Sequence, residues 1–234
     1  MKRILLLTTG GTIASRLTDE GLAPGIDGEG LARSLGALGD SYALTVRDIL
    51  HLDSSNIQPE EWRLIARHVF EARDGFDGVV ISHGTDTMAY TASVLSFMVR
   101  GIPIPVVLTG AQLPIEHPLT DGLDNLRTAF AMAAGGCAGV FLAFGRKVML
   151  GCRAVKTHTT DFAAFDSVNW PPVAVVNGAG LTLRREAIPP AAGPCALRDE
   201  LCQQVFLIKL TPGLDPEIFD MLLRMHYRGV VIEA

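Results

Sequence analysis

Two threonine hydroxyls stand where an apolar run of this chain meets glycine. Thr12 follows the apolar run at residues 4–7 and the pair Gly10-Gly11, and Thr85 follows the run at residues 79–81. A short apolar run of this kind is typical of a buried parallel strand that leaves its sheet at the carboxyl edge, where open α/β sheets bind ligands. The pattern therefore predicts two hydroxyl groups at the mouth of one sheet.

Other predicted strand ends carry small, hydroxyl or acidic residues as well, namely Ser54, Ser55, Asp86, Gly110 and Ala111. Each cluster alone is typical of a turn or a cap, but the carboxyl ends of parallel strands converge at one edge. Hydroxyl and backbone N–H groups suit a ligand carboxylate, and Asp86 suits a ligand ammonium. The pattern therefore favours a pocket for a small polar ligand, and an amino acid fits it.

A threonine hydroxyl needs a base before it can act as a nucleophile. Lys156 is the candidate, because a lysine desolvated in such a pocket could take the proton of Thr85. The alternative is a solvated surface lysine, the commonest environment of this residue type. His83 and His158 are further candidate bases, but His83 stands in a tight turn beside glycine and is interpreted as structural.

The segment Gly10-Gly11-Thr12 also has a simpler interpretation, as a strand-end turn whose threonine caps a helix. A dinucleotide site is less favoured, because the G-x-G-x-x-G spacing and the lysine of a phosphate-binding loop are both absent from this segment. The second strand end, at Thr85 and Asp86, is what favours a functional site over a plain turn.

Composition limits the classes of function. The 234 residues are 48% hydrophobic and 19% charged, and the formal net charge is −5 with no long basic run, which argues against nucleic acid or an anionic membrane as a partner. No apolar stretch is long enough for a membrane span, and the short run after Lys2 and Arg3 is interpreted as a core strand rather than a signal peptide. The four cysteines form no C-x-x-C pair, so we expect reduced thiols, a cytoplasmic location and no metal site.

Apolar runs alternate with amphipathic segments along the chain. Strands are predicted at the opening run and at 42–52, 78–82, 105–109 and 139–144, and helices at 30–38, 59–73, 88–99 and 123–134. This alternation predicts an α/β fold, a doubly wound, Rossmann-like parallel sheet with helices on both faces. Residues 16–30 are predicted to form a loop over Thr12, and residues 148–156 an extended excursion.

Three parts are predicted along the chain: an N-terminal α/β domain with the site at 1–188, a Pro/Ala/Gly-rich linker at 189–204, and a partial C-terminal β-α-β unit at 205–234. One β-α-β unit is too small to bury a core of its own. We therefore expect the last unit to dock on the main domain or on a partner, or the chain to be a shortened form of a longer one.

Three segments resemble the signatures of one family. Residues 5–14 (LLLTTGGTIA) and 78–88 (GVVISHGTDTM) look like the two signature segments of the bacterial-type L-asparaginases, and residues 156–162 (KTHTTDF) resemble a third. Residues 53–55 and 83–93 are more similar to the cytoplasmic type I branch. The resemblance implies hydrolysis of L-asparagine to L-aspartate and ammonia without a cofactor, with L-glutamine as a second substrate of some members.

The resemblance also assigns roles by position. The residues that it assigns to catalysis are Thr12, as the nucleophile that forms an acyl-enzyme, with Thr85, Asp86 and Lys156 as the second catalytic group. The groups that it assigns to the substrate are Ser54 and Ser55 for the α-carboxylate, Asp86 for the α-amino group, and the backbone N–H of Thr85 and Ala111 for the oxyanion. Which threonine attacks first stays open.

Two features depart from the family pattern. In much of the family a loop tyrosine shortly after the first threonine helps to activate that threonine, whereas the matching segment here has Leu22. The family's chains are also longer, and their remaining part packs against a second subunit and helps to complete its site. We expect a homo-oligomer, a dimer or a tetramer, that acts on a small molecule. The alternatives are a non-catalytic or weakly active amino-acid-binding member of the family and an amidotransferase subunit that acts on a misacylated tRNA.

Overall fold

The computed structural model describes residues 1–18, 21–190 and 193–234, with the side chains of these residues except 16–18, 21–24, 37 and 38. Its contacts divide the chain into two compact units, Met1–Asp199 and Glu200–Ala234, each of which has its own internal structure. The division falls inside the segment 189–204 that the sequence predicts to be a linker. The domain boundaries themselves stay a prediction.

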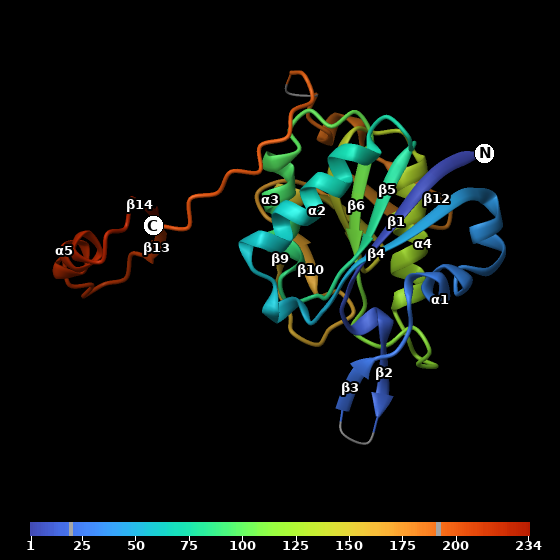
Figure 1. Ribbon diagram of the computed structural model, residues 1–234, viewed down its shortest axis with the longest axis horizontal. Coiled ribbons are helices and arrows are strands. Elements are labelled where there is room, and N and C mark those ends of the chain that lie inside the picture. The colour runs from blue at the N-terminus through green and yellow to red at the C-terminus, as the bar shows by residue number, and fades with distance from the viewer. Residues whose placement is uncertain (19–20, 191–192) are drawn as a thin grey trace. The chain divides into compact units, whose positions relative to one another are not determined.

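A parallel sheet forms the centre of the first unit. Its parallel strands lie in the order β7 (Gly139–Phe144), β6 (Pro105–Thr109), β5 (Gly78–Ser82), β1 (Lys2–Gly10) and β4 (Tyr42–Leu52) (Figure 1). Every residue of β5 and β6 is buried, because structure covers both faces of the sheet at these strands. The α/β fold predicted from the sequence is confirmed.

One edge of the sheet is antiparallel. The strands that extend the sheet beyond β7 are β8 (Lys147–Leu150), β11 (Ala174–Asn177) and β12 (Gly180–Leu183). Gly145 and Arg146 join β7 to β8, and both have positive φ, 57° and 64°. A two-residue turn of this kind can join only neighbouring antiparallel strands. This edge therefore differs from the parallel sheet that the sequence predicts.

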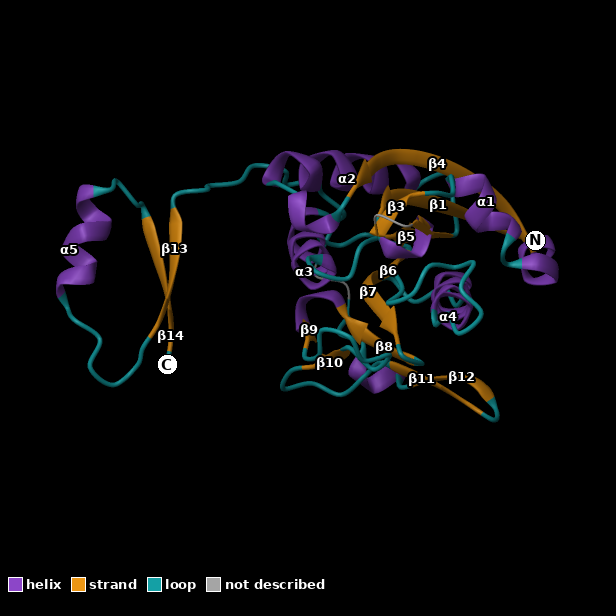
Figure 2. Cartoon of the chain, turned by 90° about the horizontal axis from the view of Figure 1, so that it is seen from below, coloured by secondary structure: helices purple, strands orange, loops and turns teal. Residues whose placement is uncertain are grey.

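Helices cover both faces of the sheet. α1 (Gly28–Arg33) and α4 (Gly122–Ala134) pack on one face, and α2 (Pro59–Ala72) and α3 (Met88–Met98) lie on the other (Figure 2). Proline at the first helical position and acidic residues in the first turn favour the start of α2 at Pro59. Alternate residues of β1, Ile4 and Leu6, belong to the core cluster that includes residues of α1 and α4.

Two hairpins differ from the sequence-based expectation. β2 (Ser15–Thr18) and β3 (Gly21–Pro24) pair in antiparallel fashion within the segment 16–30, which was expected to be a loop. β9 (Ala154–Lys156) pairs with β10 (Phe165–Ser167), and the 3₁₀ turn Gly151–Arg153 separates β9 from β8. The expected excursion at 148–156 is thus divided between two sheets, because a single turn redirects the chain without changing its hydrophobic pattern.

The second unit has the β-α-β pattern predicted for residues 205–234. β13 (Val205–Lys209) and β14 (Gly229–Glu233) pair in parallel, and α5 (Glu217–Arg224) connects them. Ile208 and Leu222 are buried, whereas many other apolar side chains of this unit are exposed, among them Leu207, Leu223 and Met225. A single β-α-β unit has too little structure to cover all of its apolar surface.

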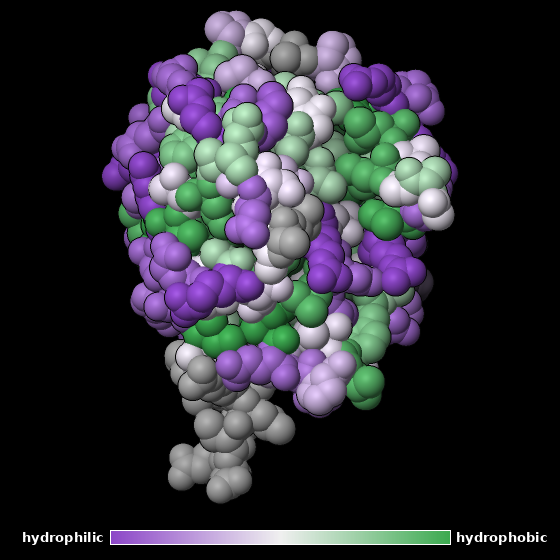
Figure 3. Space-filling model, turned by 90° about the vertical axis from the view of Figure 1, so that its right-hand side faces the viewer, coloured by the Kyte–Doolittle hydropathy of each residue, from purple (hydrophilic) through white to green (hydrophobic). Residues whose placement is uncertain are grey.

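The face of the molecule seen in Figure 3 carries both hydrophilic and hydrophobic side chains. None of the helices in the described part of the chain is long and apolar enough to cross a membrane.

Candidate active site

The carboxyl ends of the parallel strands meet at glycine residues. A Cβ atom on Gly84 would lie 2.6 Å from Oγ of Ser54, and one on Gly110 would lie 2.3 Å from the carbonyl oxygen of His83. Both distances are far below a normal van der Waals contact, so only glycine allows the loops after β4, β5 and β6 to approach this closely. The convergence predicted from the sequence is therefore present in the structure.

A cavity of about 140 Å³ opens where these strand ends meet. It contains four of the predicted site residues, Thr12, Ser54, Thr85 and Asp86. The other residues that line it are Gly10, Gly11, Ala14, Ser15, Ile26, His51, Leu52, Asp53 and Gly84. Its polar lining and small volume suit a small polar ligand.

Thr12 opens a 3₁₀ turn, Thr12–Ala14, directly after β1. The cap position of this turn is Gly11, with φ of 87°, so the alternative of a threonine cap at Thr12 is wrong. The backbone N–H of Ala14 and the hydroxyl of Ser15 both donate to the Gly11 carbonyl, at 3.1 and 3.0 Å, and fix the turn. Among the described residues, none forms a hydrogen bond with the Thr12 hydroxyl, which leaves it available to a ligand in the cavity.

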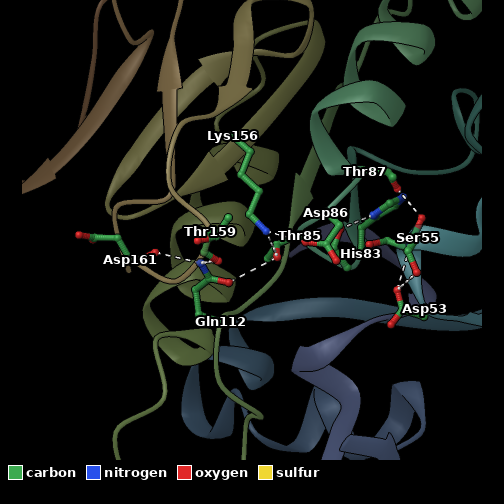
Figure 4. A network of polar contacts seen from close by, with 12 residues as sticks. Asp53, Ser55, His83, Thr85, Asp86, Thr87, Gln112, Lys156, Thr159 and Asp161 are labelled. Atoms are coloured by element: carbon green, nitrogen blue, oxygen red, sulfur yellow. Dashed lines mark hydrogen bonds and ion pairs between the residues drawn. The ribbon is translucent and has the colours of Figure 1, made fainter.

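Lys156 binds both the hydroxyl of Thr85 and the carboxylate of Asp86, just after the end of β5. Its Nζ donates to Oγ1 of Thr85 at 2.9 Å and to Oδ1 of Asp86 at 2.7 Å (Figure 4). The Lys156 side chain is only 16% exposed, so the alternative of a solvated surface lysine is wrong. The pairing of Lys156 with Phe165 in β9 and β10 holds the lysine at this place.

Ser54 and Ser55 lie differently. Ser54 is buried and lines the cavity. Ser55 is exposed and donates both its backbone N–H and its hydroxyl to Oδ1 of Asp53, each at 2.8 Å. The bond from the backbone N–H of Ser55 has the larger effect, and together the two bonds hold the pKa of Asp53 below its usual value. Ser55 is not among the residues that line the cavity.

Ala111 is buried two residues after the end of β6 and belongs to the hydrophobic core cluster. It is not among the residues that line the cavity, so its side chain makes no part of the described pocket wall. The role that the family resemblance gives it concerns only its backbone N–H, and that role stays a prediction.

His83 has no solvent contact and is held at both ring nitrogens. Nδ1 lies 2.8 Å from the Gly84 carbonyl, which can only accept, so Nδ1 carries the proton. Nε2 then accepts from the Thr91 hydroxyl at 2.9 Å, and Thr91 accepts from Trp62 Nε1 at 3.0 Å. Burial lowers the pKa of His83 to about 4. A neutral histidine with both nitrogens engaged is consistent with the structural role inferred from the sequence.

Some residues at the site were not identified from the sequence. His51 and Asp53 line the cavity, and Gln112 accepts a hydrogen bond of 3.4 Å from Thr85 Oγ1 (Figure 4). Gln112 directly follows the strand-end pair Gly110-Ala111, so its position was the available signal. The position of Leu22 lies in the part of the chain whose side chains the structure does not describe.

This geometry places the chain among α/β proteins whose sheet edge presents threonine hydroxyls to a cavity. The model of the family "Asparaginase, N-terminal" matches residues 3–189, which is most of the chain. The chain therefore belongs to the asparaginase family, as the three resembling segments predict.

Known relatives agree with this assignment. The L-asparaginase of Thermococcus kodakarensis is 46% identical over 234 residues, covering 99% of this chain and 70% of that protein, and its solved structure superposes with a TM-score of 0.90. The structure of L-asparaginase I from Vibrio cholerae is 31% identical, with a TM-score of 0.85 and coverage of 99% and 71%. A glutamyl-tRNA(Gln) amidotransferase subunit of Methanosphaera stadtmanae is 34% identical, but the chain spans only 56% of that protein's length.

Proposed function

We propose that this protein hydrolyses the side-chain amide of L-asparagine to L-aspartate and ammonia through a threonine acyl-enzyme. The observation that carries the proposal is the bond of 2.9 Å between Lys156 Nζ and Thr85 Oγ1, beside a cavity that Thr12 also lines. The similarity to proteins named L-asparaginase supports this substrate. L-Glutamine, which has the same groups on a longer side chain, is the second candidate substrate.

The cavity offers complementary groups to both ends of an amino acid. Ser54 would bind the α-carboxylate through its hydroxyl, with Ser55 as its neighbour on the same turn. Asp86 would bind the α-ammonium. Since Oδ1 of Asp86 already accepts from Lys156, Oδ2 is the oxygen available to the ligand.

The reaction would then take place in two steps. Thr12 Oγ attacks the amide carbon, the electron pair moves to the amide oxygen, and the N–H groups of Thr85 and Ala111 would stabilise that oxyanion. As the intermediate collapses, the C–N bond breaks and ammonia leaves with the proton that the hydroxyl gave up. Water then attacks the ester, releases L-aspartate and returns the proton to Thr12.

Thr85 and Lys156 would accept the proton of the attacking hydroxyl group and return it in both steps. Once Lys156 has lost a proton, its nitrogen could accept the proton of Thr85 across the same 2.9 Å contact, in the direction opposite to the hydrogen bond of the structure. The Thr85 oxygen would then be able to accept a proton from the attacking group. The alternative order, in which Thr85 attacks first, uses the same residues.

A non-catalytic or weakly active amino-acid-binding protein is the second candidate function. The observation that favours it is the Thr12 hydroxyl, which has no basic partner among the described residues, together with Leu22 at the place where the family resemblance expects a tyrosine. An amidotransferase subunit is less favoured, because the subunit of Methanosphaera stadtmanae is 34% identical to this chain, whereas the L-asparaginase of Thermococcus kodakarensis is 46% identical.

We further propose a cytoplasmic homo-oligomer, a dimer or a tetramer. A related structure described as a probable cytoplasmic L-asparaginase from Campylobacter jejuni supports the location. Exposed aromatic side chains on α3, Tyr90 and Phe97, support an interface, because they would be covered in an assembly.

Ammonia release from L-asparagine by the purified protein tests the proposal, with Thr12→Ala as the variant. We expect release by the wild type and none by the variant. A folded wild type that L-aspartate stabilises against heat, but that releases no ammonia, would instead establish the binding protein.

A further inference from the structure

Gln112 is anchored firmly at the exit of β6. Its backbone N–H donates to both carboxylate oxygens of Asp121, at 3.0 and 3.1 Å, and the N–H of Leu113 donates to the same carboxylate at 3.1 Å. Asn125, which is buried, donates to Asp121 as well, at 3.0 Å. The backbone from which the Gln112 side chain extends is therefore fixed.

The side-chain amide of Gln112 spans the loop that follows Lys156. Nε2 donates to the backbone carbonyls of Thr159 and Asp161, at 2.9 and 3.0 Å (Figure 4). The N–H of Thr157 donates to Ala164 at 2.8 Å and closes the same loop at its base. Gln112 thus holds the loop between Lys156 and Phe165 at Thr159 and Asp161, within five residues of Lys156.

These bonds determine which way the amide points. If its oxygen and nitrogen were exchanged, the oxygen would face two carbonyl oxygens, and no donor would be present between them. Oε1 therefore faces Thr85, whose Oγ1 lies 3.4 Å away. Lys156 Nζ has only donors in its charged form, so the proton of Thr85 points away from it, and Oε1 is the acceptor in that direction.

We propose that Gln112 is a positioning residue, which holds the loop after Lys156 and orients the Thr85 hydroxyl, so that the lysine and the threonine keep their hydrogen-bonded geometry. The inference rests on the proposed function for its effect on turnover. Gln112 contacts neither of the groups proposed to bind the substrate, Ser54 and Asp86, so its removal would change the rate constant of the chemical step and leave binding nearly unchanged.

Substitutions of equal length test this role. Gln112→Met keeps the length and removes all three hydrogen bonds, and we expect kcat to fall by about 10- to 100-fold with KM changed by less than about 3-fold. Gln58→Met is the matched control, since Gln58 caps the start of α2 and lies outside the proposed site. A KM that rises as much as kcat falls, or an unchanged kcat, would overturn the proposal.

Gln112→Glu supplies a rescue that a merely structural role would not show. A charged carboxylate would face the carbonyls of Thr159 and Asp161, whereas a protonated carboxyl could donate to one of them and still accept from Thr85. We expect kcat of Gln112→Glu, relative to wild type, to rise as the pH falls, and that of Gln112→Met to show no such rise. A relative kcat that does not depend on pH in either variant would contradict the orientation argued above.

Amide hydrogen exchange tests the clamp independently of any activity. In Gln112→Met we expect the backbone N–H groups of Thr157, His158 and Ala163 to exchange about 10-fold faster, because two hydrogen bonds to this loop are lost. In Gln58→Met these groups should exchange as in the wild type. Unchanged exchange in Gln112→Met would refute the clamp. If the wild type releases no ammonia, the proposed function fails, and this exchange experiment alone decides the role of Gln112.

Discussion

Gly11 and Gly84 touch: a Cβ atom on Gly11 would lie 2.4 Å from the backbone nitrogen of Gly84. Each glycine directly precedes one of the two threonines, Thr12 and Thr85. The contact therefore sets the spacing between the two hydroxyl-bearing turns, and it exists only because Gly11 has no side chain. A side chain on Gly84 would instead meet Ser54.

Gly84→Ala should disturb the close approach of Gly84 to Ser54 without removing any functional group. Its methyl group would lie 2.6 Å from Oγ of Ser54, so we expect the free energy of unfolding to fall by about 1–3 kcal/mol. Thermal unfolding measures the loss. Gly178→Ala is the control, because nothing lies within 4 Å of its Cβ position. An equal melting temperature for the two variants would show that the strand ends are looser than described.

Replacement of Lys156 should show whether the lysine acts as a base or only as a fixed positive charge. Lys156→Arg keeps a cation near Asp86, but guanidinium does not give up its proton in proteins. We therefore expect both Lys156→Arg and Lys156→Met to lose about 100-fold or more in kcat, measured by ammonia release. Substantial activity in Lys156→Arg would mean that the lysine acts through its charge alone.

Asp86→Asn should weaken ligand binding, because the ammonium of an amino acid would lose its charged partner. A charge-assisted hydrogen bond contributes about 1.5–3 kcal/mol, so the Kd for L-aspartate should rise by about 10-fold or more. Isothermal titration calorimetry measures this directly. Asp53→Asn is a useful comparison, since that carboxylate also lines the cavity but is bonded to Ser55. Equal effects in both variants would contradict the assignment of Asp86.

His83 should make the protein less stable in mild acid. The pKa of His83 is about 4 in the folded protein and has the ordinary value of 6.5 in the unfolded chain. Between these two pH values the unfolded chain therefore binds one proton more than the folded protein. Stability is therefore full above pH 6.5 and falls as the pH drops towards 4, by about 3 kcal/mol in all.

Urea unfolding at a series of pH values measures this dependence, with His83→Gln as the variant. Among the described residues, the carboxylates with a lowered pKa are Asp53, Asp77, Asp166 and Asp199; their ordinary pKa is 3.8, so they act below this window. His83→Gln should be less stable at neutral pH but should lose less stability between pH 6.5 and 4. The same acid sensitivity in both proteins would assign it to other groups.

The parallel part of the fold was predictable because it depends on local composition. Residues 79–81 are apolar throughout, and only a strand covered on both faces needs such a run. The antiparallel edge gave no such signal, since β12 is partly exposed and short, and its place depends on the turn at Gly145 and Arg146. Hydrophobic periodicity describes a segment, but it does not say which neighbour the segment pairs with.

The candidate site was predictable where its groups lie at strand ends. Thr12 and Thr85 could be expected at one edge from the order of elements alone. Lys156 is 71 residues from Thr85 in the sequence; its residue type made it the candidate base, but the hydrogen bond between the two side chains is visible only in the folded structure. Gln112 was missed for the same reason, because its partners, Thr159 and Asp161, are backbone carbonyls of a distant loop.

The bond from Trp62 through Thr91 to His83 ends at the carbonyl of Gly84, one residue before Thr85. Because its indole N–H is hydrogen-bonded to the site through Thr91 and His83, Trp62 is an intrinsic fluorescence probe of the site. The chain has only one other tryptophan, Trp170, so Trp170→Phe would leave a single emitter. The emission wavelength of Trp62 could then report ligand arrival in real time, with no dye and no coupled enzyme.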